Sequence, residues 1–291
     1  MSRRLDIDAL RALQAIAVCG GVTRAADFLS LSQSAVSHKI KRLEESIGCG
    51  LLNRRAGAPL LTESGNRLLG YADRILSLHD EALQSLSARA LSGKIRLGMT
   101  EDTTSSGLAR ILGRFTRLFP EVVVRTHVAQ SLTLQDELKD GTIDIAVMQI
   151  FARDIRARDI VLYEDSLVWA KAIDLELDWD RPVPFLAYDD NCFYKTWMLE
   201  QEALTGRKFE TVLKCSSNAG IITGVESGLG VSILNRRHVS TSMDVLTDGF
   251  TQPPHIAYIV RTSSKTRTRA VAALAEEIQR ETSDFAALEA A

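Results

Sequence analysis

Capping residues and glycines divide the first fifty residues into three short helical stretches. A Ser, Thr or Asp that can cap a helix precedes each stretch, and glycine follows the first and the third. The predicted helices are one capped by Asp8 and ended by Gly20-Gly21, one over residues 24–29 capped by Thr23, and one over residues 33–47 between Ser32 and Gly48. Three short helices at this spacing predict a helix-turn-helix.

The third predicted helix has an apolar and a polar face. Val36, Ile40 and Leu43 follow one another by four and three residues, so they share the face that packs on the other two helices. A polar helix face is more often simply solvated, but here the flanking helices favour a helix that enters the DNA major groove. The side chains predicted to meet base edges are Gln33, Ser34, Ser37 and His38, and those predicted to hold phosphates are Lys41 and Arg42.

A small hairpin is predicted directly after this helix. Two short apolar pieces flank a turn that contains Gly57 and Pro59, and Arg54 and Arg55 stand at its shoulder. From there both arginines can reach phosphates or the minor groove. The head is therefore predicted to be a winged helix-turn-helix.

Charge is distributed unevenly along the 291 residues. Residues 1–62 hold nine Lys and Arg against five acids, whereas the remainder holds 26 against 32. A basic head on an acidic body is expected where one part of a protein meets a polyanion. Without the helical motif, chance clustering would be the favoured explanation of the bias.

Residues 5–65 also carry a dense family pattern. It runs through Ala25–Leu29, Ser32–Ser37, Ile40, Leu43-Glu44, Gly48, Leu51-Leu52, Arg54 and Leu61–Gly65. This pattern resembles the amino-terminal signature of the LysR-type transcriptional regulators. Three features depart from the family pattern: Leu52 stands where the family often has Phe, Asn53 stands where Glu is common, and residues 56–58 lack the basic residue that some members carry in the wing. These departures concern the predicted contact between the wing and DNA. The resemblance implies double-stranded DNA, a small-molecule effector, RNA polymerase and further copies of the chain, as a homodimer or homotetramer, as partners.

A long helix is predicted to follow, with Thr62 as its cap. Its apolar positions alternate steps of three and four in a coiled-coil-like seam of Leu69, Ala72, Leu76, His79, Leu83, Leu86 and Ala90. A helix packed on its own chain would show the same stripe. We favour a partner helix, because a helix that tethers a small head has little of its own chain to lie against. The resemblance makes this the dimerising linker.

From residue 93 onwards, short apolar runs typical of strands alternate with helical stretches. This alternation predicts an α/β fold with a mainly parallel sheet and two lobes, which loosely resembles the periplasmic-binding-protein-like effector domain of the family. The predicted organisation is a DNA-binding domain at 1–62, a linker helix at 63–92, and an effector-binding domain at 93–291 whose first lobe is 93–164 plus 264–291 and whose second lobe is 165–263.

Ligands in such folds bind beyond the carboxyl ends of strands, between the lobes. Hydroxyl-rich turns that precede helices there suit a small anion, because helix N-termini offer free N–H groups and a positive dipole end. Helix capping alone explains many such turns. The predicted effector-binding residues are Thr100, Thr103, Ser131, Ser217, Asn218 and Cys192.

Cys192 supports a second hypothesis. It precedes a predicted helix, where the dipole and Lys195 could lower the pKa of a thiol. The region resembles that in which peroxide-sensing members of the family place a reactive cysteine, although Gln201 and Glu202 stand where those sensors have their second one. Cys215 could resolve Cys192 if the two loops meet. An oxidant-sensing regulator is therefore the alternative, and a buried structural cysteine the simpler interpretation.

Other protein classes lack support in the sequence. The cysteines and histidines show no metal-site spacing, and no nucleotide-binding or hydrolase motif occurs, so no metal, cofactor or enzymatic activity is expected. No apolar run could span a membrane, and the first residues do not form a signal peptide. We expect a cytoplasmic regulator, and a periplasmic transport protein or a small-molecule enzyme on the same body is a distant alternative.

Overall fold

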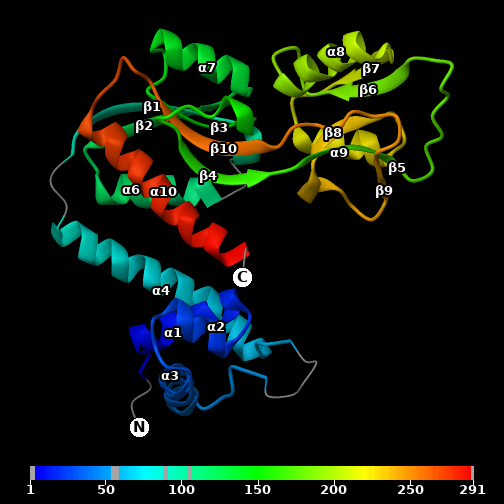
Figure 1. Cartoon of the computed structure of the whole chain (residues 1–291). Coiled ribbons are helices and arrows are strands. Elements are labelled where there is room, and N and C mark those ends of the chain that lie inside the picture. The colour runs from blue at the N-terminus through cyan, green and yellow to red at the C-terminus, as the bar shows by residue number, and fades with distance from the viewer. Residues whose placement is uncertain (1–3, 54–58, 88–90, 104–106, 290–291) are drawn as a thin grey trace. The chain divides into compact units, whose positions relative to one another are not determined.

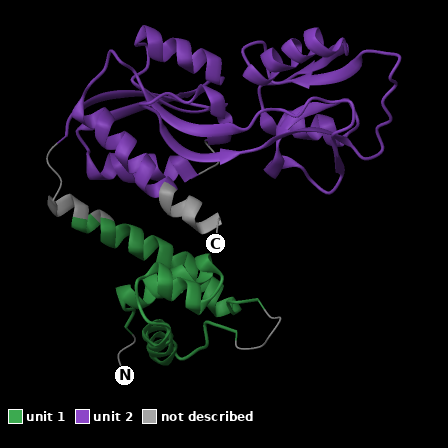
Figure 2. Ribbon diagram, in the orientation of Figure 1, with its two compact units in different colours: residues 1–89, 283–291 green, residues 90–282 purple. Residues whose placement is uncertain are grey.

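The computed structural model describes residues 4–53, 59–87, 91–103 and 107–289. Two compact units divide the chain (Figure 2). One comprises residues 1–89 and 283–291, and the other comprises residues 90–282. The helices and strands are labelled in Figure 1, and each unit is described by itself.

Unit one begins with a three-helix head. Its helices are α1 (Ile7–Cys19), α2 (Val22–Phe28) and α3 (Gln33–Ile47), followed by the long α4 (Glu63–Ser87). Asp6 caps α1, with its carboxylate accepting from the amide of Ala9 at 2.9 Å. The predicted cap, Asp8, lies inside the helix and instead pairs with Lys39 at 3.0 Å. Gly21, not Thr23, is the cap residue of α2.

The core of this head includes the beginning of α4. Ala72 and Leu76 are buried in the same apolar cluster as Leu10, Leu13 and Ile16 of α1. This corrects the expectation that the stripe of α4 lacks a partner within its own chain. The short head leaves α1 partly uncovered, and the first half of α4 covers it.

Unit two contains a first lobe built on a five-stranded sheet in the order β2-β1-β3-β10-β4. Alternating side chains of β3 face opposite layers: Ile145 and Val147 pack with α6 and α10, whereas Ala146 and Met148 pack with α7. Figure 1 shows α7 on one face of this sheet and α6 and α10 on the other. The strands are β1 (Gly93–Met99), β2 (Val122–Val128), β3 (Ile145–Phe151), β4 (Ile160–Asp165) and β10 (Ile256–Thr262). The helices are α5 (Glu101–Thr103), α6 (Ala109–Leu118), α7 (Ser131–Asp140) and α10 (Arg269–Glu289).

A second lobe follows between β4 and β10. Its strands form a three-stranded sheet, β8-β5-β9, and a pair, β6-β7, around an aromatic core that includes Trp169 and Phe185. The strands are β5 (Leu167–Ala172), β6 (Val183–Ala187), β7 (Phe209–Lys214), β8 (Ser232–Asn235) and β9 (Met243–Leu246). The helices are α8 (Phe193–Thr205), α9 (Asn218–Glu226) and a short 3-10 turn at Arg236–His238; another 3-10 turn, at Ala152–Asp154, connects β3 to β4.

The sheets are more antiparallel than the sequence predicted. β1 is parallel to β2 and β3, but β10 runs antiparallel to both β3 and β4, and β5 runs antiparallel to β8 and β9. The chain leaves the first lobe through β4 and returns through β10, so these two strands pair in opposite directions. The α/β fold with a helix-turn-helix head and a two-lobed body is confirmed.

Candidate DNA-binding surface and effector cleft

Helix α3, the predicted recognition helix, is held by its apolar face and by its caps. Val36, Ile40 and Leu43 are buried in the core of the head. Ser32 caps the helix by accepting from the amide of Ala35 at 3.2 Å, as predicted. The opposite face is solvent-exposed and carries all six residues that the sequence predicted there, namely Gln33, Ser34, Ser37, His38, Lys41 and Arg42.

Both lysines of α3 have carboxylate neighbours. Lys39 bonds to Asp8 at 3.0 Å, and this hydrogen bond lowers the pKa of the Asp8 carboxyl. Lys41 lies 3.9 Å from Glu45 on the same helix. Both pairs are at the surface, where a phosphate can compete for the ammonium group at little cost. The arrangement suits a helix face that approaches nucleic acid.

A carboxylate joins α3 to the base of the wing. Glu44 accepts from the amides of Leu51 at 2.7 Å and of Leu52 at 3.3 Å. Leu52 and Leu61 then form an antiparallel bridge, which agrees with the predicted hairpin. Gly65 is required here, because a Cβ would lie 2.3 Å from the carbonyl oxygen of Leu51. The predicted contacts of Arg54 and Arg55 lie outside the described residues.

A small cleft lies where the two lobes of unit two meet, and three helices begin at it. Gln130 and Ser131 open α7, Cys192 precedes α8, and Asn218 opens α9. The described lining residues are Thr100, Glu101, Asp102, Gln130, Ser131, Gln149, Tyr188, Cys192, Phe193, Tyr194 and Asn218. Three converging N-termini bring positive dipole ends to the cleft.

Four of the six predicted effector residues line this cleft: Thr100, Ser131, Cys192 and Asn218. The other two have hydroxyls engaged elsewhere. Thr103 donates to the carbonyl oxygen of Thr100 at 2.7 Å, and Ser217 donates to Glu101 at 3.1 Å. The hydroxyl oxygen of Thr100, a residue only 6% exposed, has no hydrogen-bond partner among the described residues. A buried hydroxyl in this state is costly unless a ligand or water satisfies it.

Two carboxylates of the first lobe accept hydrogen bonds from the second lobe. The sequence analysis did not single out either of them. Glu101 accepts from the amide of Asn218 at 2.6 Å, at the first residue of α9. Asp102 accepts from the side-chain amides of Asn218 and, at 3.4 Å, of Asn235. The position of these acids directly after a strand could have marked them as candidate cleft residues. Only the tertiary fold shows that they reach the N-terminus of α9.

Beneath these carboxylates lies a buried hydrogen-bond network that also joins the lobes. Tyr194 of α8 donates to Gln149 at 2.7 Å, and Gln149 donates to Tyr258 at 2.7 Å. Burial raises the pKa of both tyrosines well above the usual range, so their hydroxyls stay protonated. Such fully paired networks fix one arrangement of the lobes.

Two family models match the chain. The model described as "Bacterial regulatory helix-turn-helix protein, lysR family" matches residues 7–66. The model described as "LysR substrate binding domain" matches residues 88–283, more than half of the chain. The chain belongs to the LysR-type transcriptional regulators. This LysR-type regulator therefore pairs a DNA-binding head with a substrate-binding domain.

Relatives agree with this assignment. Over 281 residues the chain is 29% identical to the HTH-type transcriptional regulator DgdR of Burkholderia cepacia, covering 96% of this chain and 95% of that protein. It is also 29% identical to the HTH-type transcriptional regulator PecT of Dickeya dadantii, covering 87% and 80%. The crystal structure of full-length BenM shares the fold, with a TM-score of 0.52 at 20% identity and coverage of 97% and 98%.

In this LysR-type regulator the Cys192 thiol is not activated. Burial raises its pKa to about 12, and the amides of Lys195 and Tyr194 counteract this only in part. Lys195 was expected to lower the pKa, but its ammonium pairs with Asp190 at 2.5 Å. The expectation of a low thiol pKa is thus wrong, because desolvation outweighs the helix dipole.

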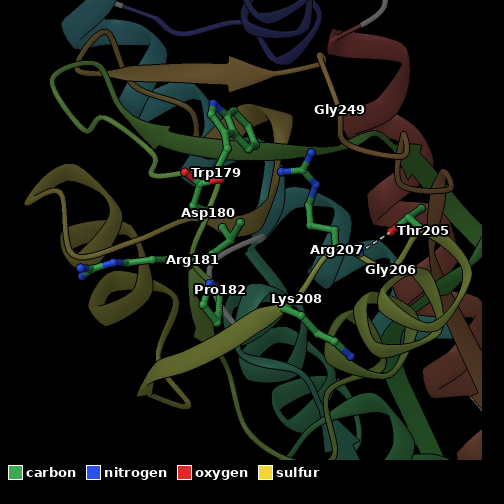
Figure 3. A pocket seen from close by; sticks show the side chains of 10 residues that line it. Trp179, Asp180, Arg181, Pro182, Thr205, Gly206, Arg207, Lys208 and Gly249 are labelled. Atoms are coloured by element: carbon green, nitrogen blue, oxygen red, sulfur yellow. Dashed lines mark hydrogen bonds between the residues drawn. The ribbon is translucent and has the colours of Figure 1, made fainter.

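A wider cavity lies in the second lobe (Figure 3). Arg207 crosses it, with its guanidinium 4.4 Å from the ring centre of Trp179 and 5.1 Å from that of Phe250. Thr205 and Gly206 in its wall form the C-terminal end of α8, whose carbonyl groups disfavour an anion. No buried unpartnered polar atom among the described residues belongs to this wall. We therefore place no site there.

Among the described residues, no three His, Cys, Asp or Glu side chains are grouped as a metal site would require. None of the helices described is both long and apolar enough to cross a membrane.

Proposed function

We propose that this regulator is controlled by a small effector that binds in the cleft between the lobes of residues 90–282 through an anionic group. The observation that carries the proposal is the buried, unpartnered hydroxyl of Thr100 in a cleft where α7, α8 and α9 begin. A carboxylate at the N-terminus of α7 would accept from free backbone amides and from Thr100. Gln130, the cap residue of α7, makes no side-chain cap bond that would compete.

The effector acts through its different affinities for two arrangements of the lobes. Because the regulator binds DNA as a homodimer or homotetramer, a change in the body alters the spacing of two heads and hence the fit to two half-sites. The exposed face of α3 reads the bases, with RNA polymerase as the further partner at the promoter. The protein performs no catalysis in this role.

A promoter reporter tests this proposal. Thr100→Val and Ser131→Ala should each lose the response to a metabolite pool, with effector-free DNA binding measured in parallel. Glu164→Gln, an exposed position on β4, is the matched control and should respond normally. A full response in Thr100→Val would contradict the proposal.

The oxidant-sensing alternative has a separate prediction. If Cys192 were the sensor, Cys192→Ser would lose a peroxide response while the hydroxyl variants kept it. The burial of Cys192 and its raised pKa favour the metabolite effector. A peroxide response that is lost only in Cys192→Ser would reverse this preference.

A further inference from the structure

The residues that precede α1 are attached to α3 by one serine side chain. The hydroxyl of Ser46 accepts from the backbone amide of Arg4 at 3.0 Å and donates to the carbonyl oxygen of Arg4 at 2.8 Å. Ordering the backbone of a terminal residue costs conformational entropy, and two hydrogen bonds to one residue offset that cost. Arg4 is thereby held beside a helix that lies 42 positions further along the chain.

The side chain of Arg4 takes no part in this attachment. Both hydrogen bonds use main-chain atoms, so any residue at position 4 could make them. Arg4 is exposed, and no ion pair joins its guanidinium group to a described residue. The attachment therefore orders a cation without using its charge, and the position of Ser46 on α3 decides where this charge lies.

Ser46 lies on a flank of α3, between the buried face and the predicted recognition face. Lys39, Arg42 and Ser46 follow one another by three and four residues, so they lie along one side of the helix. Lys39 is held by Asp8 at 3.0 Å, whereas Arg42 is exposed. The attachment at Ser46 therefore adds the positive charge of Arg4 to a flank that already carries two cations.

The flanks of a helix in the major groove are where phosphates are met. The exposed face of such a helix approaches base edges, and the two sugar-phosphate backbones run along its sides. Figure 1 shows α3 on the side of the head that is remote from α4, so a residue attached to α3 lies on the side where DNA is expected. A guanidinium group suits a phosphate there, because its donors match two phosphate oxygens.

We infer that Arg4 contacts a phosphate group of the bound DNA and that Ser46 is the residue that positions it. This inference rests on the reading of DNA by α3 proposed above and does not involve the effector cleft. Because phosphates carry no sequence information, the contact adds affinity for all DNA sequences alike.

The salt dependence of DNA binding by the full-length chain tests the contact of Arg4. The probes are a duplex pool of random sequence and the tightest binders selected from that pool. Arg4→Ala should weaken binding to both probes and reduce the slope of log K against log salt by about 0.9 for each bound head. From about 50 to about 200 mM salt, the affinity gap to the wild-type chain should thus narrow about 3.5-fold per head. Arg4→Lys keeps the charge and should keep the slope.

A double-mutant cycle tests the positioning role of Ser46. Ser46→Ala keeps the charge of Arg4 but removes the attachment, so it should weaken DNA binding in the wild-type chain and have no further effect in Arg4→Ala. Thermal unfolding of each variant checks that the head stays folded. An equal loss of affinity from Ser46→Ala in both backgrounds would mean that Ser46 acts on α3 alone, and would overturn its positioning role.

The outcomes separate this inference from the proposed reading of DNA by α3. An unchanged affinity and slope in Arg4→Ala, together with a reduced slope in Arg42→Ala, would overturn the phosphate contact of Arg4 alone. Unchanged slopes in both variants would contradict the placement of α3 on DNA, and the inference with it. A changed sequence preference in Arg4→Ala at a constant slope would make Arg4 a base-reading residue and would also overturn the phosphate contact.

Discussion

Arg42 is the side chain on α3 best placed to test the phosphate contacts. It is exposed on the recognition face. Arg42→Ala should weaken binding to all DNA sequences and reduce the slope of log K against log salt by about 0.9, the value for one phosphate contact. Arg11→Ala is the control, because Arg11 pairs with Asp80 of α4 at 2.8 Å and lies off that face. Altered sequence preference with an unchanged salt slope would reassign Arg42 to base reading.

Glu44 connects the recognition helix to the wing, so its loss should affect stability. Glu44→Ala leaves the amides of Leu51 and Leu52 without their acceptor, and we expect the head to lose about 1–3 kcal/mol of unfolding free energy. Glu44→Gln retains an acceptor oxygen and should therefore keep most of the unfolding free energy that Glu44→Ala loses. Urea unfolding followed by circular dichroism measures both variants, and equal loss in the two would show that the charge matters more than the hydrogen bonds.

Cysteine reactivity gives a third prediction at the residue scale. With a pKa of about 12, the Cys192 thiol is ionised in about one molecule in ten thousand at pH 8. Iodoacetamide should therefore label the exposed Cys49 and leave Cys192 unmodified until the protein unfolds. Mass spectrometry after a timed pulse measures this, and rapid native labelling of Cys192 would contradict its burial.

At the level of elements, α4 shows what hydrophobic periodicity can and cannot predict. The steps of three and four correctly predicted a helix with an apolar stripe, but they do not indicate which part of the protein covers that stripe. Leu76 is 4% exposed in the core of the head. Leu83 of the same stripe is 55% exposed, so the head covers only the first half of the stripe. Two further exposed apolar side chains of α4, Tyr71 and Leu78, lie on another face, are 56% and 61% exposed and are seven residues apart.

This second face is where we expect copies of the chain to meet. Leu78→Lys with Tyr71→Lys should lower the sedimentation coefficient and abolish binding to paired half-sites, while the head stays folded. Leu76→Lys should instead unfold the head, because it places an ammonium group in an apolar core. An unchanged sedimentation coefficient in the double variant would place the interface elsewhere.

The other strands were predictable where β-branched side chains are concentrated. The valine-rich run Val122–Val128 predicts a strand with the bounds that the structure has, although most of its side chains are exposed. The short β9 was missed, because Met243–Leu246 shows no such run, and so was the single turn of α5. The cleft residues at helix starts could be predicted because their side chains are typical of helix caps. Glu101 could not be predicted in this way, since its partner Asn218 is 117 residues away in sequence.

On the scale of the whole molecule, the two units have separate apolar cores. Ala9 to Leu76 supply the core of unit one, and the clusters of unit two draw on residues 95–278. Units with independent cores unfold as separate cooperative transitions unless a large apolar interface couples them. Scanning calorimetry of the full chain should therefore show two transitions, of which Glu44→Ala lowers only the one that belongs to the head.

A ligand that binds the cleft should raise only the other transition, because binding stabilises the folded unit that contains the site. At a hundredfold excess over Kd the gain is about 2.7 kcal/mol, which is resolvable by calorimetry. The same ligand added to Thr100→Val should leave both transitions in place. If the ligand also shifts the melting temperature of the head in the wild-type chain, then effector binding changes the unfolding free energy of the DNA-binding unit. In that case the effector would act on the head itself as well as on the spacing of two heads.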